Sequence, residues 1–226
     1  NNSYAYNKNY EYKEHIIIPS SVTRKKQVGY HYDDDGKIIY EYDYISYTVV
    51  GIDSHAFQSC FDLMSVTIPS SVTSIGNDAF YACRSLTSLT IPSSVTSIGS
   101  SAFEHCSSLT SLTIPSGVTE ISDNFFYGCS SLTNISIPSG VEHIGNSAFY
   151  GCSSLTNISI PSGVKDIGFS AFQGCSSLTS VTIPSCVTRI LSNVFYGCSS
   201  LTNISIPSGV EYIGSSAFEG CSSLAV

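Results

Sequence analysis

The sequence is poor in several residue types, and each shortage narrows the class of protein it can encode. It has no tryptophan and a single methionine, and only 12% of its 226 residues are charged. Basic residues are the scarcer charged kind, with 9 lysines and arginines against 17 aspartates and glutamates, for a formal net charge of −8. A chain without a basic face cannot displace the counterions of phosphate groups, so we predict that it does not bind nucleic acid.

Long apolar runs are missing as well. No stretch of about 18 consecutive apolar residues exists, so we predict no membrane insertion by this segment. The first six residues, Asn-Asn-Ser-Tyr-Ala-Tyr, lack the basic start and apolar middle of a secretion signal. We therefore expect either that such a signal has been removed or that there was none.

What the sequence has in abundance is a repeat of 23 residues. The prolines of Ile-Pro pairs, the cysteines and the phenylalanines all recur at this interval, and chance does not explain three residue types sharing one period. Seven repeats begin with a leucine, from Leu63 to Leu201, and a degenerate eighth copy occupies 40–62, where Ile45, Val49 and Ile52 still fit. The prolines are Pro69, Pro92, Pro115, Pro138, Pro161, Pro184 and Pro207, and the cysteines are Cys60, Cys83, Cys106, Cys129, Cys152, Cys175, Cys198 and Cys221.

The repeat that begins at Leu86 shows how one coil is built. Leu89 and Ile91 alternate with polar residues, as expected for a short strand with one buried face, and Pro92 ends its hydrogen-bonding ladder. Gly99 permits a bend, after which Ser100 can cap a short helical turn. Because one repeat buries too little on its own, the coils must stack. We predict an α/β solenoid, a right-handed superhelix with short parallel strands on its concave face and turns or short helical segments on its convex face.

The pattern L-x-x-L-x-I-P-x-x-V-x-x-I-G-x-x-A-F-x-x-C resembles that of the BspA-like leucine-rich repeat family. The resemblance covers residues 63–226 almost without gaps and is weaker over 40–62. It implies a leucine-rich-repeat solenoid in a surface or secreted protein that adheres to host matrix proteins, other cells or host receptors, and it implies no catalytic residues. In two repeats Gly and Ala are replaced together, by Ser122 with Phe125 and by Leu191 with Val194. We interpret these as paired packing changes on the convex side.

The two ends of the chain differ from the repeats. Residues 1–39 are rich in tyrosine, and we assign them to an N-terminal cap and residues 40–226 to the solenoid. The alternating segments 28–32 and 38–42 flank an Asp-rich turn, which predicts a hairpin or a distorted first coil. A sticky aromatic binding patch is the alternative. The chain stops where another strand would begin, which favours a fragment of a longer array over an edge that dimerises.

No group of residues predicts catalysis, a metal or a cofactor. The eight periodic cysteines lack C-x-x-C spacing, so we expect them to be buried, reduced and apolar in character. Cys186 stands in a turn where other repeats have Ser or Gly, and we expect an exposed, reactive thiol there. The acidic run at 33–36 lacks the acidic twelfth position of a calcium loop and is interpreted as a solvated turn. We therefore predict that the protein is not an enzyme.

The candidate binding residues are those that vary from repeat to repeat. The strand faces carry a neutral lattice of Ser, Thr and Asn, without the aromatic or arginine anchors of binding hot spots. Three asparagines of this lattice, Asn134, Asn157 and Asn203, begin N-x-Ser sequons and are candidate glycosylation sites. The variable residues lie at turn pairs and convex positions: Glu120, Glu142, His143, Lys165, Asp166, Arg189, Glu211, Tyr212, Tyr127, Tyr150 and Tyr196.

The regular scaffold without catalytic groups predicts a non-enzymatic module that binds protein partners through its lateral edge, and the resemblance implies that it is adhesive and lies at a cell surface or is secreted. A passive structural spacer is the main alternative. A second alternative is that the Ser and Thr ranks bind glycans or an ordered lattice such as ice. The sequence identifies no individual ligand and leaves the oligomeric state open.

Overall fold

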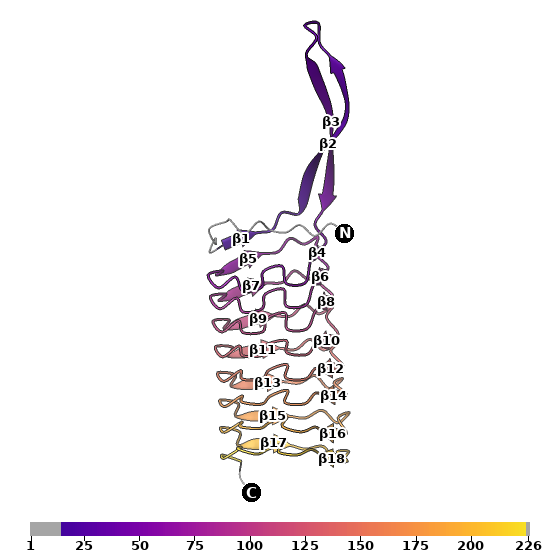
Figure 1. Cartoon of the computed structure of the whole chain (residues 1–226). Helices are drawn as coiled ribbons and strands as arrows, with labels where there is room; N and C mark the ends of the chain where they lie inside the picture. Colours follow the sequence, from indigo (N-terminus) through magenta and orange to yellow (C-terminus); the bar gives the residue numbers. More distant parts are fainter. Residues whose placement is uncertain (1–14, 225–226) are drawn as a thin grey trace.

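The computed structural model describes residues 15–224, which form a regular stack of coils with a long two-stranded ribbon at its N-terminal end (Figure 1). Each coil gives a three-residue strand to one parallel sheet of eight strands, here called the first sheet. In spatial order its strands are β1 (His15–Ile17), β5 (Ser65–Thr67), β7 (Ser88–Thr90), β9 (Ser111–Thr113), β11 (Asn134–Ser136), β13 (Asn157–Ser159), β15 (Ser180–Thr182) and β17 (Asn203–Ser205).

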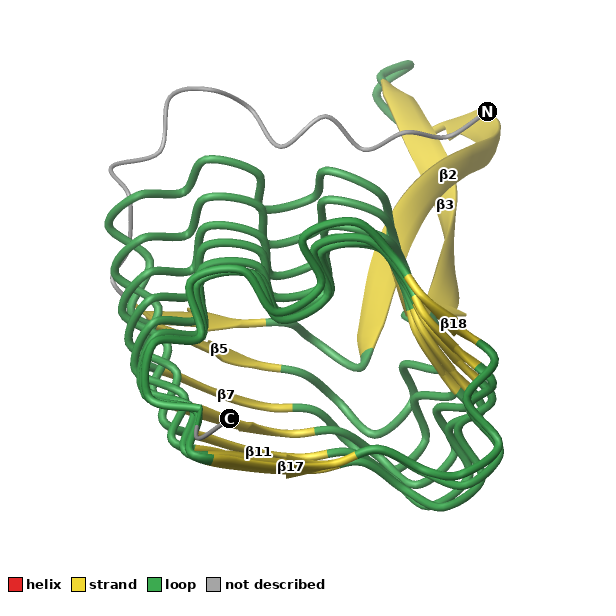
Figure 2. Cartoon of the chain, turned by 90° about the horizontal axis from the view of Figure 1, so that it is seen from below, coloured by secondary structure: helices red, strands yellow, loops and turns green. Residues whose placement is uncertain are grey.

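Alternation of apolar and polar residues forms the first sheet, as the sequence predicts. In β7 the side chain of Leu89 is buried, whereas Ser88 and Thr90 on either side of it are exposed. Neighbouring strands pair in a register that places equivalent residues over one another, with Val66 opposite Leu89. The predicted stacking of equivalent side chains is therefore confirmed, and Figure 2 shows the coils superposed along the axis of the stack.

The core consists of columns that run the length of the stack. Phenylalanine rings lie on one another from coil to coil, and the ring centroids of Phe57 and Phe80 are 5.1 Å apart. Beside them, the thiols of the cysteine column donate hydrogen bonds to phenylalanine carbonyls 26 residues earlier, as from Cys129 Sγ to Phe103 O at 3.1 Å. Such columns require coils of one length, which explains the constant period of the sequence.

A second, shorter ladder follows the turn after each Ile-Pro pair. Its two-residue strands are β4 (Gly51–Ile52), β6 (Ser74–Ile75), β8 (Ser97–Ile98), β10 (Glu120–Ile121), β12 (His143–Ile144), β14 (Asp166–Ile167), β16 (Arg189–Ile190) and β18 (Tyr212–Ile213). The ladder is divided into three pieces, β4-β6-β8, β10-β12-β14 and β16-β18. The two breaks fall at the coils of Ser122 and Leu191, where the glycine of the pattern is replaced.

A close approach between coils explains why the pattern calls for glycine. A Cβ on Gly99 would lie 2.6 Å from the backbone nitrogen of Asn77, closer than real Cβ contacts come. The glycine also donates a backbone hydrogen bond to the preceding coil, as from Gly145 N–H to Ile121 O at 2.7 Å. A residue with a side chain at this position therefore moves the two coils apart, and the second ladder loses the hydrogen bond from that residue's N–H to the preceding coil.

The coil of Ser122 shows how the sequence compensates for this separation. The Ser122 hydroxyl donates to Ile98 O at 3.1 Å, so the side chain supplies the bond that the backbone gives elsewhere. Phe125, which replaces the alanine of the pattern, is fully buried with its ring centroid 4.8 Å from that of Phe126. Both partners of the replacement act on the packing between coils, in agreement with their interpretation as a pair.

The convex side holds turns, and within residues 15–224 it holds no helix, so the predicted α/β class with short helical segments is not confirmed. Two residues per coil adopt a positive φ, for example Ser101 at 55° and His105 at 59°, and a right-handed helix does not admit such residues. Their N–H groups point along the stack instead, as Ser101 N–H donates to Asp123 O of the next coil at 2.9 Å. The described residues therefore form a solenoid of strands and turns.

The ribbon is inserted into the first coil. β1 pairs with β5, and Ile16 lies opposite Val66. The chain then leaves the coil through β2 (Ser21–Tyr32) and returns through the antiparallel β3 (Ile38–Thr48). The base is closed where Val49 N–H donates to Ser20 O at 2.9 Å. Pro19 and Pro69 are 50 positions apart, 27 more than the period of 23, so the ribbon corresponds to an insertion of 27 residues.

This insertion places several residues differently from the sequence expectation. The boundary expected between residues 39 and 40 falls inside β3. Ile45, assigned to the core of the degenerate repeat, lies in the ribbon and is 38% exposed, while Ile18 packs against the core. Val49 and Ile52 do take their repeat positions, and Ile52 pairs with Ile75. The first part of the expected cap, residues 1–14, lies outside the described residues.

Candidate interaction site

The candidate residues of the turn pairs gather along the second ladder. Five of them open successive strands and are exposed in one column: Glu120, His143, Asp166, Arg189 and Tyr212. Glu142, Lys165 and Glu211 precede three of these and are exposed beside them. We call these eight residues the lateral column. Nearer the N-terminus the same positions hold the Thr-Ser pairs 73–74 and 96–97, so the charged chemistry is confined to the later coils.

Side chains of the lateral column pair between coils. Lys165 Nζ donates to Glu142 Oε2 at 2.6 Å, and His143 Nδ1 lies 2.9 Å from Asp166 Oδ2. The hydrogen bond to the Lys165 ammonium lowers the pKa of Glu142, and the same bond raises the pKa of Lys165. Because all four side chains are at least half exposed, solvent screens these pairs and leaves them little weight in folding.

Two exposed aromatic side chains, Phe169 and Tyr212, lie along the C-terminal part of the lateral column. The guanidinium of Arg189 lies 5.1 Å from the centroid of the Tyr212 ring, in cation–π geometry, and Tyr212 is 45% exposed. Phe169, in the coil before Arg189, is 52% exposed just after β14. We did not single out Phe169 from the sequence, although a signal was present, because the other coils hold a polar residue such as Asn146 or Ser192 at this position.

The three candidate tyrosines lie in the turns of the coil and not in the strands of the second ladder. Figure 2 shows that turns and strands form different faces of the coil. The rings of Tyr127 and Tyr150 are stacked with centroids 4.5 Å apart, and desolvation, followed by the proximity of Tyr150, raises the pKa of Tyr127. His105 meets the Tyr127 ring edge-on at 5.3 Å. Tyr196 stands apart, because Gln173 occupies the intervening coil. The structure therefore does not join these tyrosines to the lateral column.

The candidate glycosylation sites lie on the exposed face of the first sheet. Asn134 and Asn157 are direct neighbours in β11 and β13, and each amide donates to the hydroxyl of the threonine before it, at 3.4 and 3.3 Å. Asn203 has the same arrangement in β17. Adjacent strands are about 4.8 Å apart, so sugars on Asn134 and Asn157 would crowd each other.

The cysteines divide into two environments, as expected. Cys186 is exposed, whereas six of the eight periodic cysteines are buried and two, Cys60 and Cys221, are half-buried. Burial raises the pKa of the Cys83 thiol to about 12, which keeps it protonated and unreactive at neutral pH. The reactivity of Cys186 stays a prediction.

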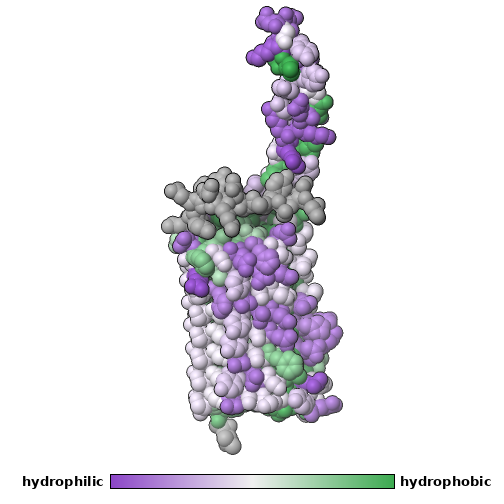
Figure 3. Space-filling view, viewed as in Figure 1, coloured by the Kyte–Doolittle hydropathy of each residue, from purple (hydrophilic) through white to green (hydrophobic). Residues whose placement is uncertain are grey.

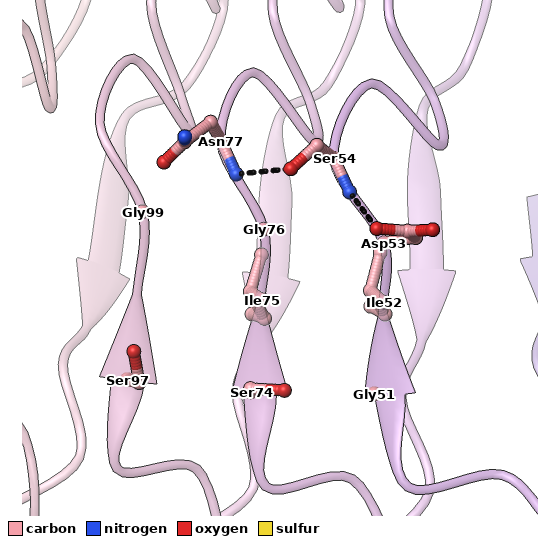
Figure 4. Close-up of a pocket in the computed structure, with 10 residues that line it drawn as sticks. All are labelled: Gly51, Ile52, Asp53, Ser54, Ser74, Ile75, Gly76, Asn77, Ser97 and Gly99. Carbon is pink, nitrogen blue, oxygen red and sulfur yellow. Dashed lines mark hydrogen bonds between the residues drawn. The ribbon is translucent and has the colours of Figure 1, made fainter.

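A shallow hollow of about 460 Å³ lies at the ends of β4, β6 and β8 (Figure 4). Three of its polar side chains make hydrogen bonds within and between coils: Ser54 Oγ accepts from Asn77 N–H at 3.2 Å, Asp53 Oδ1 accepts from Ser54 N–H at 2.8 Å, and Asn77 Oδ1 accepts from Ser100 N–H at 2.9 Å. Three of its ten lining residues are glycines: Gly51, Gly76 and Gly99. The hollow is therefore a consequence of coil geometry and does not present a catalytic arrangement.

Two further observations apply to residues 15–224 alone. No group of three or more His, Cys, Asp or Glu side chains there is placed to hold a metal ion. No helix in that range is long and apolar enough to cross a membrane.

Known proteins share the repeat and the coil. The sequence matches the family described as BspA type leucine-rich repeat region in six copies, over residues 50–152 and 119–226. A leucine-rich repeat protein of T. pallidum has a similar structure, with 27% identity and a TM-score of 0.58 over 95% of this chain and 79% of that one.

Two other solved structures are similar at lower TM-scores. A leucine-rich repeat protein of Bacteroides ovatus has 25% identity and a TM-score of 0.45, over 93% of this chain and 73% of that one. A leucine-rich cell surface protein of Faecalibacterium prausnitzii has 26% identity and a TM-score of 0.42, over 94% and 86%. No curated protein is similar enough to count as a relative. Because the family repeat covers most of the sequence, the chain belongs to the family of proteins with BspA-type leucine-rich repeats.

Proposed function

We propose that this chain is a non-enzymatic protein-binding module of a cell-surface or secreted protein, and that the lateral column with Phe169 is its binding surface. Proteins with leucine-rich repeats generally serve as scaffolds for protein interaction. Adhesion to a host or matrix protein is the specific form of that role which we propose here. The observation that supports it is the exposed Arg189 lying over the ring of Tyr212.

The chemistry of the lateral column suits a protein surface. Arginine and tyrosine are, with tryptophan, the residues enriched in binding hot spots, and an Arg held over a ring is already partly ordered before the partner arrives. The charges around the pair are of both signs, with Glu142 beside Lys165. A mosaic of this kind complements a mixed polar surface and steers encounter without selecting for polyanions.

A catalytic role for this surface has little support. Solenoids of this family are typically non-catalytic. The His143–Asp166 pair lies on an open surface, with the two side chains 51% and 74% exposed. Water therefore surrounds the pair, and general acid–base groups gain most of their effect where water is excluded.

The experiment compares faces by returning variable residues to the repeat consensus. Arg189→Ser, Tyr212→Ser and Phe169→Ser each restore a residue that another coil already carries, so the fold is kept. The controls are Tyr150→Gln with Tyr196→Gln on the turn side, where Gln173 already stands in one coil, and Asn134→Ser on the first sheet. Each protein is titrated against purified matrix proteins and a glycan array.

We expect the triple lateral variant to lose at least ~10-fold in affinity for a matrix protein, and the control variants to change by less than ~2-fold. Equal losses on all faces would contradict the assignment of the surface. Loss on Asn134→Ser alone, with glycans as the ligand, would favour recognition by the polar strand face. A wild type that binds no probe tighter than ~1 mM would favour the passive spacer.

A further inference from the structure

Within the described residues the ribbon packs against no other element. β2 and β3 pair only with each other, and Figures 1 and 3 show them standing clear of the coils. An isolated two-stranded ribbon is marginally stable in water. This one nevertheless exposes eleven valine, isoleucine and tyrosine side chains between residues 22 and 47. An exposed surface of this kind is typical of a site of protein association.

The pairing register sorts these side chains onto two faces. Tyr30 lies directly opposite Tyr40, and Tyr32 lies opposite Ile38. Residues at alternate positions along β3 share that face. We call this set the tyrosine face; its members are Lys25, Gln27, Tyr30, Tyr32, Ile38, Tyr40, Tyr42 and Tyr44. The opposite face is mixed, with His31 Nδ1 3.1 Å from Glu41 Oε1.

An irregularity in β2 creates the tyrosine face. The register shifts between Gln27 and Gly29, so Val28 is an extra residue in β2. If Val28 were paired in an unshifted register, Tyr30 would lie opposite Ile39 and would point to the opposite side of the ribbon, because a slip of one residue reverses the facing of every side chain beyond it. The shift therefore gathers the tyrosines of both strands onto one surface.

The tyrosine face is large enough for a specific contact. Its rings lie near one another, with centroids 6.0 Å apart for Tyr30 and Tyr32, and Lys25 Nζ lies 3.6 Å from the centroid of Tyr42. Exposure of its tyrosines ranges from 39% for Tyr42 to 69% for Tyr44. With ~200 Å² per aromatic side chain, the exposed area of the five tyrosines is on the order of 600 Å² per copy. Two copies would therefore bury ~1,200 Å² in total, which is the lower bound of stable interfaces.

We propose that the tyrosine face docks on the tyrosine face of a second copy of this chain, antiparallel, about a two-fold axis at the Tyr30–Tyr40 pair. Towards its base the ribbon carries Lys25 on the tyrosine face and Lys26 on the opposite face, across from Asp43, and its tip carries the exposed acidic residues Asp34 and Asp35. Both groups lie roughly 15 Å from Tyr30 along the strand. An antiparallel copy therefore places the basic end of each ribbon beside the acidic tip of the other.

Asp33 takes no part in the pairing of charges between the two ribbons, because its carboxylate already accepts the N–H of Lys37 at 2.8 Å and shapes the turn.

The proposed contact between ribbons uses no residue of the lateral column. Docking would cover one face of each ribbon, and the solenoid bodies would extend away from the contact. The result is a divalent molecule in which two lateral columns are presented together.

The first test uses sedimentation velocity of the full chain over a concentration series. The variant Tyr30→Ser with Tyr40→Ser removes a cross-strand pair at the proposed axis. Its matched control, Ile39→Ser with Tyr47→Ser, removes two exposed β-forming residues from the opposite face. We expect a dimer of micromolar affinity that the first variant weakens by ~100-fold and the control by less than ~3-fold. Equal weakening, or a wild type that stays monomeric at ~200 μM, would overturn the proposal.

The second test addresses the antiparallel arrangement. Lys25→Glu with Lys26→Glu makes both ends of the ribbon acidic, and Asp34→Lys with Asp35→Lys makes both ends basic. Each variant alone should repel itself and remain monomeric at low salt, whereas an equimolar mixture should form a heterodimer. A mixture that stays monomeric, or a single variant that dimerises as tightly as wild type, would rule the arrangement out. Retained circular dichroism shows that the coils are folded in each case.

Discussion

The coils and the ribbon are built from similar apolar residues but place them oppositely. In the coils Phe149 is fully buried, and in the ribbon Tyr44 is 69% exposed. Each coil shares its core with its neighbours, so its stability depends on the common period. The ribbon depends on pairs between its own two strands. The constant spacing of 23 residues is therefore required only of segments whose side chains enter the stacked core, and a segment outside the core can have any length.

The largest expected difference between the two regions arises at alkaline pH, because the coils hold a column of thiols and the ribbon holds none. Burial raises the pKa of Cys83 and of Cys198 to about 12, whereas a thiol of the unfolded chain has a pKa of about 8.5. The folded state therefore retains protons that the unfolded state loses. This contribution to stability is complete below about pH 8.5 and is lost as the pH rises towards 12.

Urea unfolding followed by circular dichroism at several pH values checks this expectation. Each thiol that ionises only on unfolding lowers the free energy of unfolding by about 1.4 kcal/mol per pH unit in that window. Replacing Cys129 and Cys152 with alanine should flatten the dependence on pH. A free energy of unfolding that stays constant up to about pH 10 would contradict the buried column.

The next largest difference is in the free energy of unfolding lost when an aromatic ring is removed from a coil or from the ribbon. Phe149→Ala opens a cavity in the column and should lower the free energy of unfolding by ~3–5 kcal/mol. Tyr44→Ala removes a ring that the described chain leaves in solvent and should lower it by less than ~0.5 kcal/mol. Denaturant unfolding of both variants at low protein concentration measures the difference. Similar losses for the two would mean that the ribbon packs on the coils.

Alanine substitutions at one glycine of the coils and one of the ribbon should differ less in their effect on stability. A Cβ on Gly168 would meet the backbone of Asn146 in the preceding coil, so Gly168→Ala should cost ~2 kcal/mol and divide the second ladder as Ser122 does. Gly36, at the ribbon tip, has open space around it and a φ of 78°, so Gly36→Ala should cost only ~1 kcal/mol through backbone strain. Thermal unfolding compares the two. An alanine at 168 that is tolerated as well as one at 36 would disprove the close approach.

The smallest effect is expected at the charged pair of the lateral column. The side chains of Glu142 and Lys165 are both more than half exposed, so Glu142→Gln should leave the melting temperature unchanged within error at neutral pH. The pKa of Glu142 is lowered in the folded state, so whatever stability the pair adds is present above the unfolded pKa and is lost as the pH falls. A clear drop in melting temperature would show that the pair has a structural role.

The stack itself could be predicted from the sequence because its signal is repeated. Leu89, Phe103 and Cys106 have counterparts at every period, and only stacking satisfies all of them at once. The convex side could not be predicted in this way. Ser100 followed by Ala102 and Phe103 is typical of a capped helix, and the positive φ of Ser101 depends on a hydrogen bond to the next coil.

The hairpin predicted around the Asp-rich turn is confirmed as the β2–β3 ribbon. Its insertion within a coil and one residue of the proposed binding surface were not predicted, for different reasons. The insertion has a length close to one period, so Ile45 fitted the repeat by position although Ile18 packs against the core. Variation at the turn pairs did locate the lateral column. Phe169 was overlooked because it lies outside those pairs, in a position that is otherwise polar.

The central claim is that the coils form one self-sufficient stack into which the ribbon has been inserted. Deleting residues 22–48 joins Ser21 to Val49 and restores the Ile-Pro-Ser-Ser-Val sequence found at 68–72. The most direct test is thermal unfolding of this deletion variant beside the full chain. We expect a cooperative transition with a melting temperature within ~3 °C of that of the full chain, and an unchanged strand signal in circular dichroism. A variant that is unfolded, or that melts far below the parent, would contradict it.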